Sequence, residues 1–173
     1  DNESPLFSDL AYIRWEKEVV FYHELHRIDV TVRLDWDGTN TEILLGFPLS
    51  IALEHTNAYY EIPFGALERR PCFEVPYSSP ESKKVSSEPA QLDATGAWPA
   101  QTWVAYGDED WGMVLANEGT PAHRMRNGTI EVGVLRSPTR KFGPFSAPPG
   151  ALETGRHVYR FSLCPYREDW RND

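Results

Sequence analysis

The sequence predicts an all-β fold, an antiparallel β-sandwich of the supersandwich type with long loops rich in Pro and Ser. Short apolar or alternating segments recur about every ten residues, separated by segments rich in Pro, Gly or Asp. No amphipathic pattern extends beyond about two helical turns, and no segment repeats another at a fixed period. This spacing is typical of a sandwich rather than of an α/β fold, a propeller or a solenoid.

The clearest strand lies in the second half of residues 15–35. Its apolar residues Ile28, Val30, Val32 and Leu34 alternate with polar ones, which is the pattern of a half-buried strand. Turn-forming residues follow at 36–39, and an apolar run resumes at 42–48. We therefore expect these two segments to form a hairpin.

The remaining strands are shorter, and they bring the expected total to about nine. They are expected at residues 50–54, 58–62, 68–69, 101–106, 111–116, 128–136 and 155–165. The segments 76–99 and 139–154 are rich in loop-forming residues and are expected to be long loops. We expect residues 1–14 to be an N-terminal extension or linker and residues 15–173 to form a single β-sandwich domain, since the length suits one hydrophobic core.

Composition excludes several kinds of partner. The formal net charge is −9 and no cluster of five Lys or Arg occurs, so nucleic acid is not an expected partner. No apolar run approaches the length of a membrane span. The two cysteines, Cys72 and Cys164, are too few for a disulfide scaffold, which favours a reducing compartment and a cytoplasmic location.

No metal site is expected in this chain. His23 and His26 are three residues apart, and the segment around them resembles a strand. Side chains at these positions of a strand point to opposite faces, so one metal ion could not bind both. We interpret both histidines as structural or surface residues.

No catalytic residue is expected either. Glycosidases need two facing carboxylates, and the clusters Asp35/Asp37 and Asp108–Asp110 supply candidates. Asp is also a preferred turn residue, because its side chain bonds its own backbone, and this explains both clusters. The sequence contains no Gly-x-Ser-x-Gly nucleophile motif.

Tryptophans near loops raise the possibility of sugar binding. Trp98, Trp103, Trp111 and Trp170 lie close to expected loops, and an indole ring can stack on the apolar face of a pyranose. Trp103 and Trp111 are our candidates for sugar stacking. The competing interpretation, that these rings fill the sandwich core, stays open.

The order of several motifs resembles the C-terminal region of family 38 glycoside hydrolases, the α-mannosidases. The segment YYEIPFG at 59–65, with Glu68 and Arg69 after it, is similar to that family's YEI-FG-ER signature. Similar segments follow in the same order: PAQTWV at 99–104, WGMVLANEG at 111–119, GTIEVGVLRSP at 128–138, GRHVYRFSLCP at 155–165 and DWR at 169–171. The resemblance covers roughly residues 15–171.

The resemblance implies a β-sandwich that packs beside a separate catalytic barrel of a parent α-mannosidase. In that family the zinc ion and both catalytic aspartates belong to the upstream barrel, so this chain alone is expected to be inactive. Two residues are implied as candidates for the rim of the substrate cleft: Arg136, at the LLRSP-type position, and Asn117 at the end of a neighbouring strand. The implied partners are the catalytic domain of the parent chain and, at the rim, mannosides.

Two other functions stay open at this point. The domain could be a stand-alone carbohydrate-binding module, which requires solvent-facing Trp or Tyr rings. It could also be a purely structural or interaction sandwich. Solvent exposure of the Trp98, Trp103 and Trp111 rings would favour the carbohydrate-binding module, and their burial would favour the structural or interaction sandwich.

Overall fold

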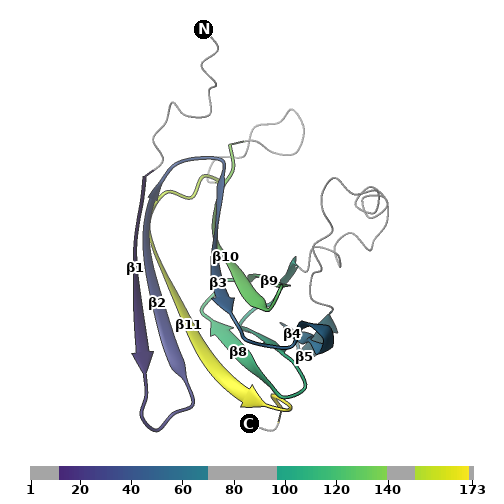
Figure 1. Cartoon of the computed structure of the whole chain (residues 1–173). Helices are drawn as coiled ribbons and strands as arrows, with labels where there is room; N and C mark the ends of the chain where they lie inside the picture. Colours follow the sequence, from purple (N-terminus) through teal and green to yellow (C-terminus); the bar gives the residue numbers. More distant parts are fainter. Residues whose placement is uncertain (1–11, 70–96, 140–150, 172–173) are drawn as a thin grey trace, which may run out of the picture.

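The computed structural model describes residues 12–69, 97–139 and 151–171, and it shows two antiparallel sheets packed face to face (Figure 1). One sheet has seven strands in the order β1-β2-β11-β8-β7-β4-β5, and the other has four in the order β3-β10-β9-β6. The predicted all-β sandwich is confirmed. The strands are β1 (Tyr12–Phe21), β2 (Ile28–Asp37), β3 (Thr41–Pro48), β4 (Asn57–Ile62), β5 (Gly65–Arg69), β6 (Ala97–Pro99), β7 (Trp103–Gly107), β8 (Trp111–Asn117), β9 (Ala122–Arg126), β10 (Thr129–Ser137) and β11 (Gly155–Arg167).

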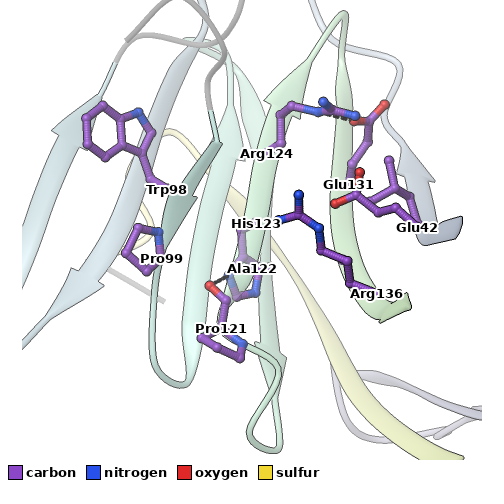
Figure 2. Close-up of a pocket in the computed structure, with 11 residues that line it drawn as sticks. Glu42, Trp98, Pro99, Pro121, Ala122, His123, Arg124, Glu131 and Arg136 are labelled. Atoms are coloured by element: carbon purple, nitrogen blue, oxygen red, sulfur yellow. Dashed lines mark hydrogen bonds and ion pairs between the residues drawn. The ribbon is translucent and has the colours of Figure 1, made fainter. Parts of the chain in front are cut away.

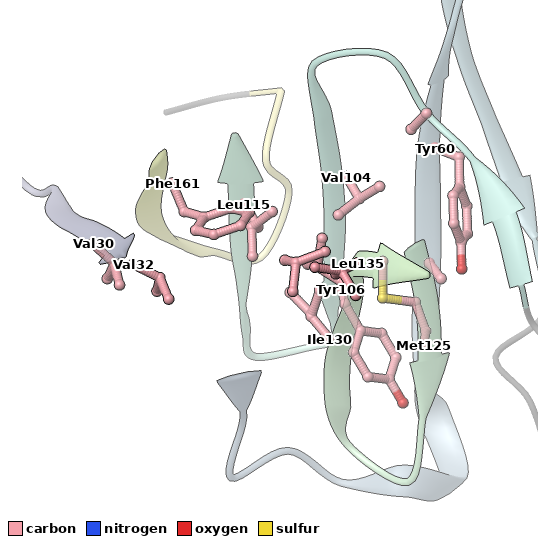
Figure 3. Packing of buried hydrophobic residues seen from close by; sticks show 14 of the residues in the cluster. Val30, Val32, Tyr60, Val104, Tyr106, Leu115, Met125, Ile130, Leu135 and Phe161 are labelled. Carbon is pink, nitrogen blue, oxygen red and sulfur yellow. The ribbon is translucent and has the colours of Figure 1, made fainter. Parts of the chain in front are cut away.

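The core lies between the two sheets and is built by alternation along each strand (Figure 3). Its largest fully buried side chains are Tyr60, Tyr106, Leu115, Met125 and Ile130, which come from five strands of both sheets. Each such side chain stabilises the fold by about 1.5–3 kcal/mol through removal from water. The sandwich is therefore held mainly by contacts between residues far apart in the sequence.

β2 is the strand that the sequence identifies most clearly. Val30, Val32, Leu34 and Trp36 are all buried. β2 pairs with β1 on one side and with β11 on the other. The predicted half-buried strand is confirmed, and it lies inside the larger sheet.

The predicted hairpin between residues 28–34 and 42–48 is wrong. β2 belongs to the seven-stranded sheet, whereas β3 pairs with β10 in the four-stranded one. Residues 38–40 carry the chain across the sandwich instead of turning it back. Asn40 makes this possible: it adopts a positive φ of 52°, which Asn tolerates, and its backbone N–H donates to the carbonyl of Ser137.

The predicted strand at residues 50–54 is also wrong. Leu53–His55 forms a short 3₁₀ turn, η1. Side chains from the β7–β8 turn hold this segment: the Asp108 carboxylate accepts the Ala52 N–H at 2.7 Å, and the Trp111 indole N–H donates to the Ser50 carbonyl at 3.1 Å. These bonds take the place of a strand ladder.

Three strands, β1, β6 and β9, lie where none is expected from the sequence. β6 occupies the end of the expected loop 76–99, of which residues 76–96 lie outside the described residues. β9 was missed because His123, Arg124 and Arg126 mask its alternation, although His123 and Met125 point inward. Of the expected loop 139–154, residues 140–150 lie outside the described part, and residues 151–154 contain no strand.

β1 begins at Tyr12, within the range 1–14 that we expect to be an extension, and it extends the larger sheet as an edge strand. Residues 22–27, which include His23 and His26, form the turn between β1 and β2 and are not a strand as expected. In the described part of the chain, no helix is long and apolar enough to cross a membrane.

Candidate functional site

Arg136 lies near the end of β10, on the outer face of the four-stranded sheet. Its side chain is exposed, and its register partner on the neighbouring strand β3 is Glu42. Both residues therefore project from the same face of the sheet. A β-bulge between Gly133 and Leu135 shifts the register just before this pair. Bulges of this kind redirect the side chains that follow them.

The backbone around Arg136 is fixed by the residues next to it. The buried Ser137 hydroxyl lies 3.2 Å from the Gly38 carbonyl and 3.1 Å from the Glu153 carbonyl. The Arg136 N–H donates to the Glu153 carboxylate at 3.3 Å. The Arg-Ser sequence thus joins β10 to the crossing turn at residues 38–40 and to the start of β11.

Two adjoining pockets meet at Arg136. The larger, about 350 Å³, runs across the outer face of the four-stranded sheet and is lined among others by Glu42, Trp98, Arg124 and Arg136 (Figure 2). The smaller, about 280 Å³, is lined by Asn40, Thr41, Glu42, Arg136 and Pro138. Arg136 and Glu42 line both pockets.

The charged groups of the larger pocket differ in what they bind. Glu131 forms ion pairs with Arg124 at 2.5 Å and with Arg126 at 3.3 Å, so its charge is compensated inside the sheet. In contrast, the Arg136 guanidinium has no ion pair or side-chain hydrogen bond with the residues that the structure describes. The described residues thus leave its five N–H donors without a side-chain acceptor.

Asn117, the second rim candidate, is buried inside the sandwich at the end of β8. The expectation that it ends a strand next to that of Arg136 is wrong, because β8 belongs to the seven-stranded sheet and β10 to the four-stranded one. Its amide oxygen accepts the Thr120 N–H at 2.7 Å, and its amide nitrogen lies 3.2 Å from Nε2 of His123. Both amide atoms are therefore used within the domain, where they fix the turn between β8 and β9.

His123 is a buried neutral imidazole that the sequence analysis does not single out. Its Nδ1 lies 3.0 Å from the Pro121 carbonyl, which can only accept, so Nδ1 carries the proton and Nε2 accepts from Asn117. Burial lowers the pKa of His123 to about 4, and the hydrogen bond to Pro121 only partly offsets this. The ring stays neutral at neutral pH.

Trp103 and Trp111, the candidates for sugar stacking, are both half-buried. The Trp103 ring packs against Trp170 with centroids 4.8 Å apart, and Trp170 also contacts Tyr59 at 5.6 Å. Trp170 thus packs over the outer face of the larger sheet. The Trp111 indole is held by its bond to Ser50. These contacts give both rings a role in packing the domain.

Trp98 lies beside the larger pocket. The Arg69 guanidinium stacks over its ring at 3.6 Å from the centroid. A guanidinium over an indole is a favourable cation–π contact. This contact covers one face of the indole ring.

The acidic clusters serve the fold. Asp108 accepts the N–H groups of Asp110 and Trp111, both at 3.0 Å, as expected for a turn aspartate. The hydrogen bond from the Ala52 N–H, followed by these two, lowers the pKa of Asp108. Asp35 and Asp37, in contrast, lie within β2 and not in a turn as predicted. Asp35 pairs with Arg156 at 3.5 Å on the outer face.

Within residues 12–69, 97–139 and 151–171, no group of three or more His, Cys, Asp or Glu side chains could hold a metal ion. His23 and His26 are exposed in the β1–β2 turn. The described residues thus do not fit the zinc ion that the family resemblance implies for the parent enzyme, and no chemical step of this chain is assigned to a metal.

Glu42 is the residue of this site that the sequence analysis missed. It is the polar position at the start of an apolar run, and alternation alone places it on the same face as Leu44. Its position beside Arg136 depends on the β3–β10 register, which no local signal in the sequence specifies.

Comparison with known proteins agrees with this fold. A family model described as "Glycosyl hydrolases family 38 C-terminal domain" matches residues 7–143. Two solved structures from Enterococcus faecalis have the same fold, a family 38 glycosyl hydrolase (TM-score 0.66, 15% identity, 89% of this chain and 16% of that one) and an α-mannosidase (TM-score 0.69, 15% identity, 91% and 16%).

Among curated proteins, α-mannosidase G of Dictyostelium discoideum is 24% identical over 149 residues, and human α-mannosidase 2C1 is 24% identical over 161 residues. The matches cover 86% and 93% of this chain, but only 12% of the length of each relative. Since the family model matches well over half of the residues, this chain belongs to the C-terminal domain family of the family 38 glycosyl hydrolases.

Proposed function

We propose that this domain is a non-catalytic part of an α-mannosidase, in which it packs against a zinc-containing catalytic domain of the same polypeptide and carries Arg136 to the rim of the substrate cleft. The curated relatives are named as α-mannosidases, and the chain corresponds to about an eighth of their length. Because the chain matches so small a part of these relatives, their catalytic domain can lie in another part of the polypeptide.

The observation that carries the proposal is the state of Arg136. An exposed guanidinium without a side-chain partner among the described residues sits on a backbone fixed by Ser137 and Glu153, beside two pockets. A planar fork of donors suits the hydroxyl pairs of a sugar or a carboxylate of the catalytic domain. Fixing its backbone lowers the entropy lost when it binds.

The carboxylates of this chain give little support to bond cleavage by the domain itself. Glycosidases with retention place two carboxylates about 5–5.5 Å apart. Asp108 is occupied by three backbone N–H groups, and Glu61 accepts from Thr102 and Trp103. These bonds lower the pKa of both groups, which suits structural anions rather than a proton donor.

Substitution of Arg136 tests this proposal in the polypeptide encoded by the complete reading frame. We expect Arg136→Ala to lower kcat/KM on a chromogenic α-mannoside by about tenfold, because a charge-assisted hydrogen bond is lost. Arg136→Lys should retain only part of the kcat/KM that Arg136→Ala loses, since lysine keeps the positive charge but not the planar set of guanidinium donors.

Arg156→Ala is the matched control, because its side chain is 89% exposed and its ion pair with Asp35 joins β11 to β2 in the other sheet. It should leave kcat/KM unchanged. Equal activity of Arg136→Ala and the unsubstituted protein would rule out a role for Arg136 at the rim.

A further inference from the structure

β1 has two faces of opposite character. On its outer face Glu16 and Glu18 pair with Arg33 of β2 at 3.3 and 3.0 Å. The other face carries the alternate residues Ile13, Trp15, Lys17, Val19 and Phe21. Of these, Trp15 is 63% and Phe21 73% exposed. β1 therefore has the pattern of a strand with one buried face, yet that apolar face is open.

The apolar face is open because the two sheets differ in width. The inward residues of β2 are buried, whereas β1 lies one strand further out at the sheet edge. In the four-stranded sheet, β3 is one of the two edge strands within the described residues. Two pockets of about 340 and 280 Å³ lie along β1 and β3, and both are lined by Lys17 and Leu45. The space beside β3 is thus lined mostly by apolar side chains.

A free sheet edge next to an apolar groove favours an extended segment as its occupant. An edge strand presents unpaired backbone N–H and C=O groups, which another strand can satisfy. A strand beside β3 would at the same time place its alternate side chains on Trp15 and Phe21. A helix or a loop would cover the apolar face but leave unpaired those N–H and C=O groups of β3 that point away from β10.

We infer that a β-strand from another part of the longer α-mannosidase polypeptide adds to the free edge of β3 and covers the apolar face of β1. The inference rests on the proposed function, since it needs polypeptide beyond these 173 residues, and the relatives are about eight times longer than the region matched. The strand has apolar residues at alternate positions. It has an Asp or Glu opposite Lys17, the one cation on this face of β1.

The position of the groove links the strand to the rim site. Leu44 of β3 lines both the β1 groove and the larger pocket at Arg136. Glu42, on the same strand, is the register partner of Arg136. A strand paired with β3 would therefore bring the rest of the polypeptide next to Arg136 and would hold the rim in place.

Hydrogen exchange of the β3 amides tests the inference in the polypeptide of the complete reading frame. We expect slow exchange for those amides of residues 41–47 that are not bonded to β10, and faster exchange of the same amides by about tenfold or more when Trp15→Glu and Phe21→Glu are combined. The control is Val20→Glu, on the other face of β1, which should leave β3 protected. The amides of β7 should stay protected in every variant and would show that the fold is intact.

Fast exchange of β3 in the unsubstituted polypeptide, equal to that of the double variant, would overturn the inference. Protection of β3 that falls on dilution would overturn it too, because the cover would then be a second copy. Protection of β3 that persists in the double variant would mean that no strand packs on β1. The exchange rates of β3 are measured independently of the kcat/KM of Arg136→Ala. A failure of the added-strand inference is therefore distinguishable from a failure of the proposed function.

Discussion

Gly112→Ala is expected to lower the free energy of unfolding by about 3 kcal/mol, because the new methyl group has no space. A Cβ on Gly112 would lie 2.3 Å from the Tyr166 ring and 2.8 Å from Cα of Gly107. Gly112 pairs with both Gly107 and Tyr166 across the sheet. The ring is buried and the Gly107 contact is backbone, so neither side can yield without disturbing β7, β8 and β11 together.

Urea unfolding followed by tryptophan fluorescence measures this change. Gly65→Ala serves as control, since the nearest atom to its added Cβ is Ile62 Cγ1 at 4.0 Å. We expect the control to change stability by at most about 1 kcal/mol. A Gly112→Ala protein as stable as the control would show that Tyr166 does not lie against the two glycines.

The second large effect is a loss of stability below pH 6.5 that comes from His123. Its folded pKa of about 4 lies below the ordinary value of 6.5 because the ring is buried. Above pH 6.5 the ring is neutral in both states. As the pH falls from 6.5 to 4, the unfolded chain binds a proton that the folded chain does not, so the free energy of unfolding falls. At pH 5 the loss is about 2 kcal/mol.

The cause is visible in the hydrogen bonds of the ring. Protonation of Nε2 would set its N–H against the amide N–H of Asn117, which is held in place by Thr120. The lowered pKa values of Glu61 and Asp108 add their own loss of stability, but only as the pH falls below their ordinary values near 4. The window between pH 6.5 and 4.5 therefore reports on His123.

Denaturant midpoints across this window in the wild type and in His123→Asn check the assignment. Asn can donate to the Pro121 carbonyl from about the position of Nδ1 but does not titrate. We expect it to be less stable than wild type at pH 7.5 and to lose little further stability down to pH 5. An unchanged pH dependence in His123→Asn would assign the effect to other groups.

The fold class could be predicted from the sequence because alternation and turn residues are local signals. The alternation at residues 28–34 gave β2 correctly, and Asp108 forms the predicted turn. The partner of each strand could not be predicted in the same way. The pattern of residues 42–48 is equally compatible with a hairpin to β2 and with the observed pairing to β10.

In the candidate site, too, local features could be predicted from the sequence, whereas features that depend on strand pairing could not. The resemblance placed Arg136 and Asn117 near the ends of neighbouring strands, but only packing decides which side chain reaches solvent. Asn117 points inward to His123, whereas Arg136 follows a bulge and lines the pocket on the outer face. A bulge and a register are properties of strand pairs, so one strand's sequence does not specify them.

Assaying the isolated 173-residue chain beside the polypeptide of the complete reading frame tests the supporting role most directly. Both are incubated with a chromogenic α-mannoside and zinc, with heat-treated samples as controls. We predict turnover by the complete polypeptide and none by the isolated chain. Turnover by the isolated chain that is lost on heating would contradict the proposal and would place the catalytic groups inside this domain.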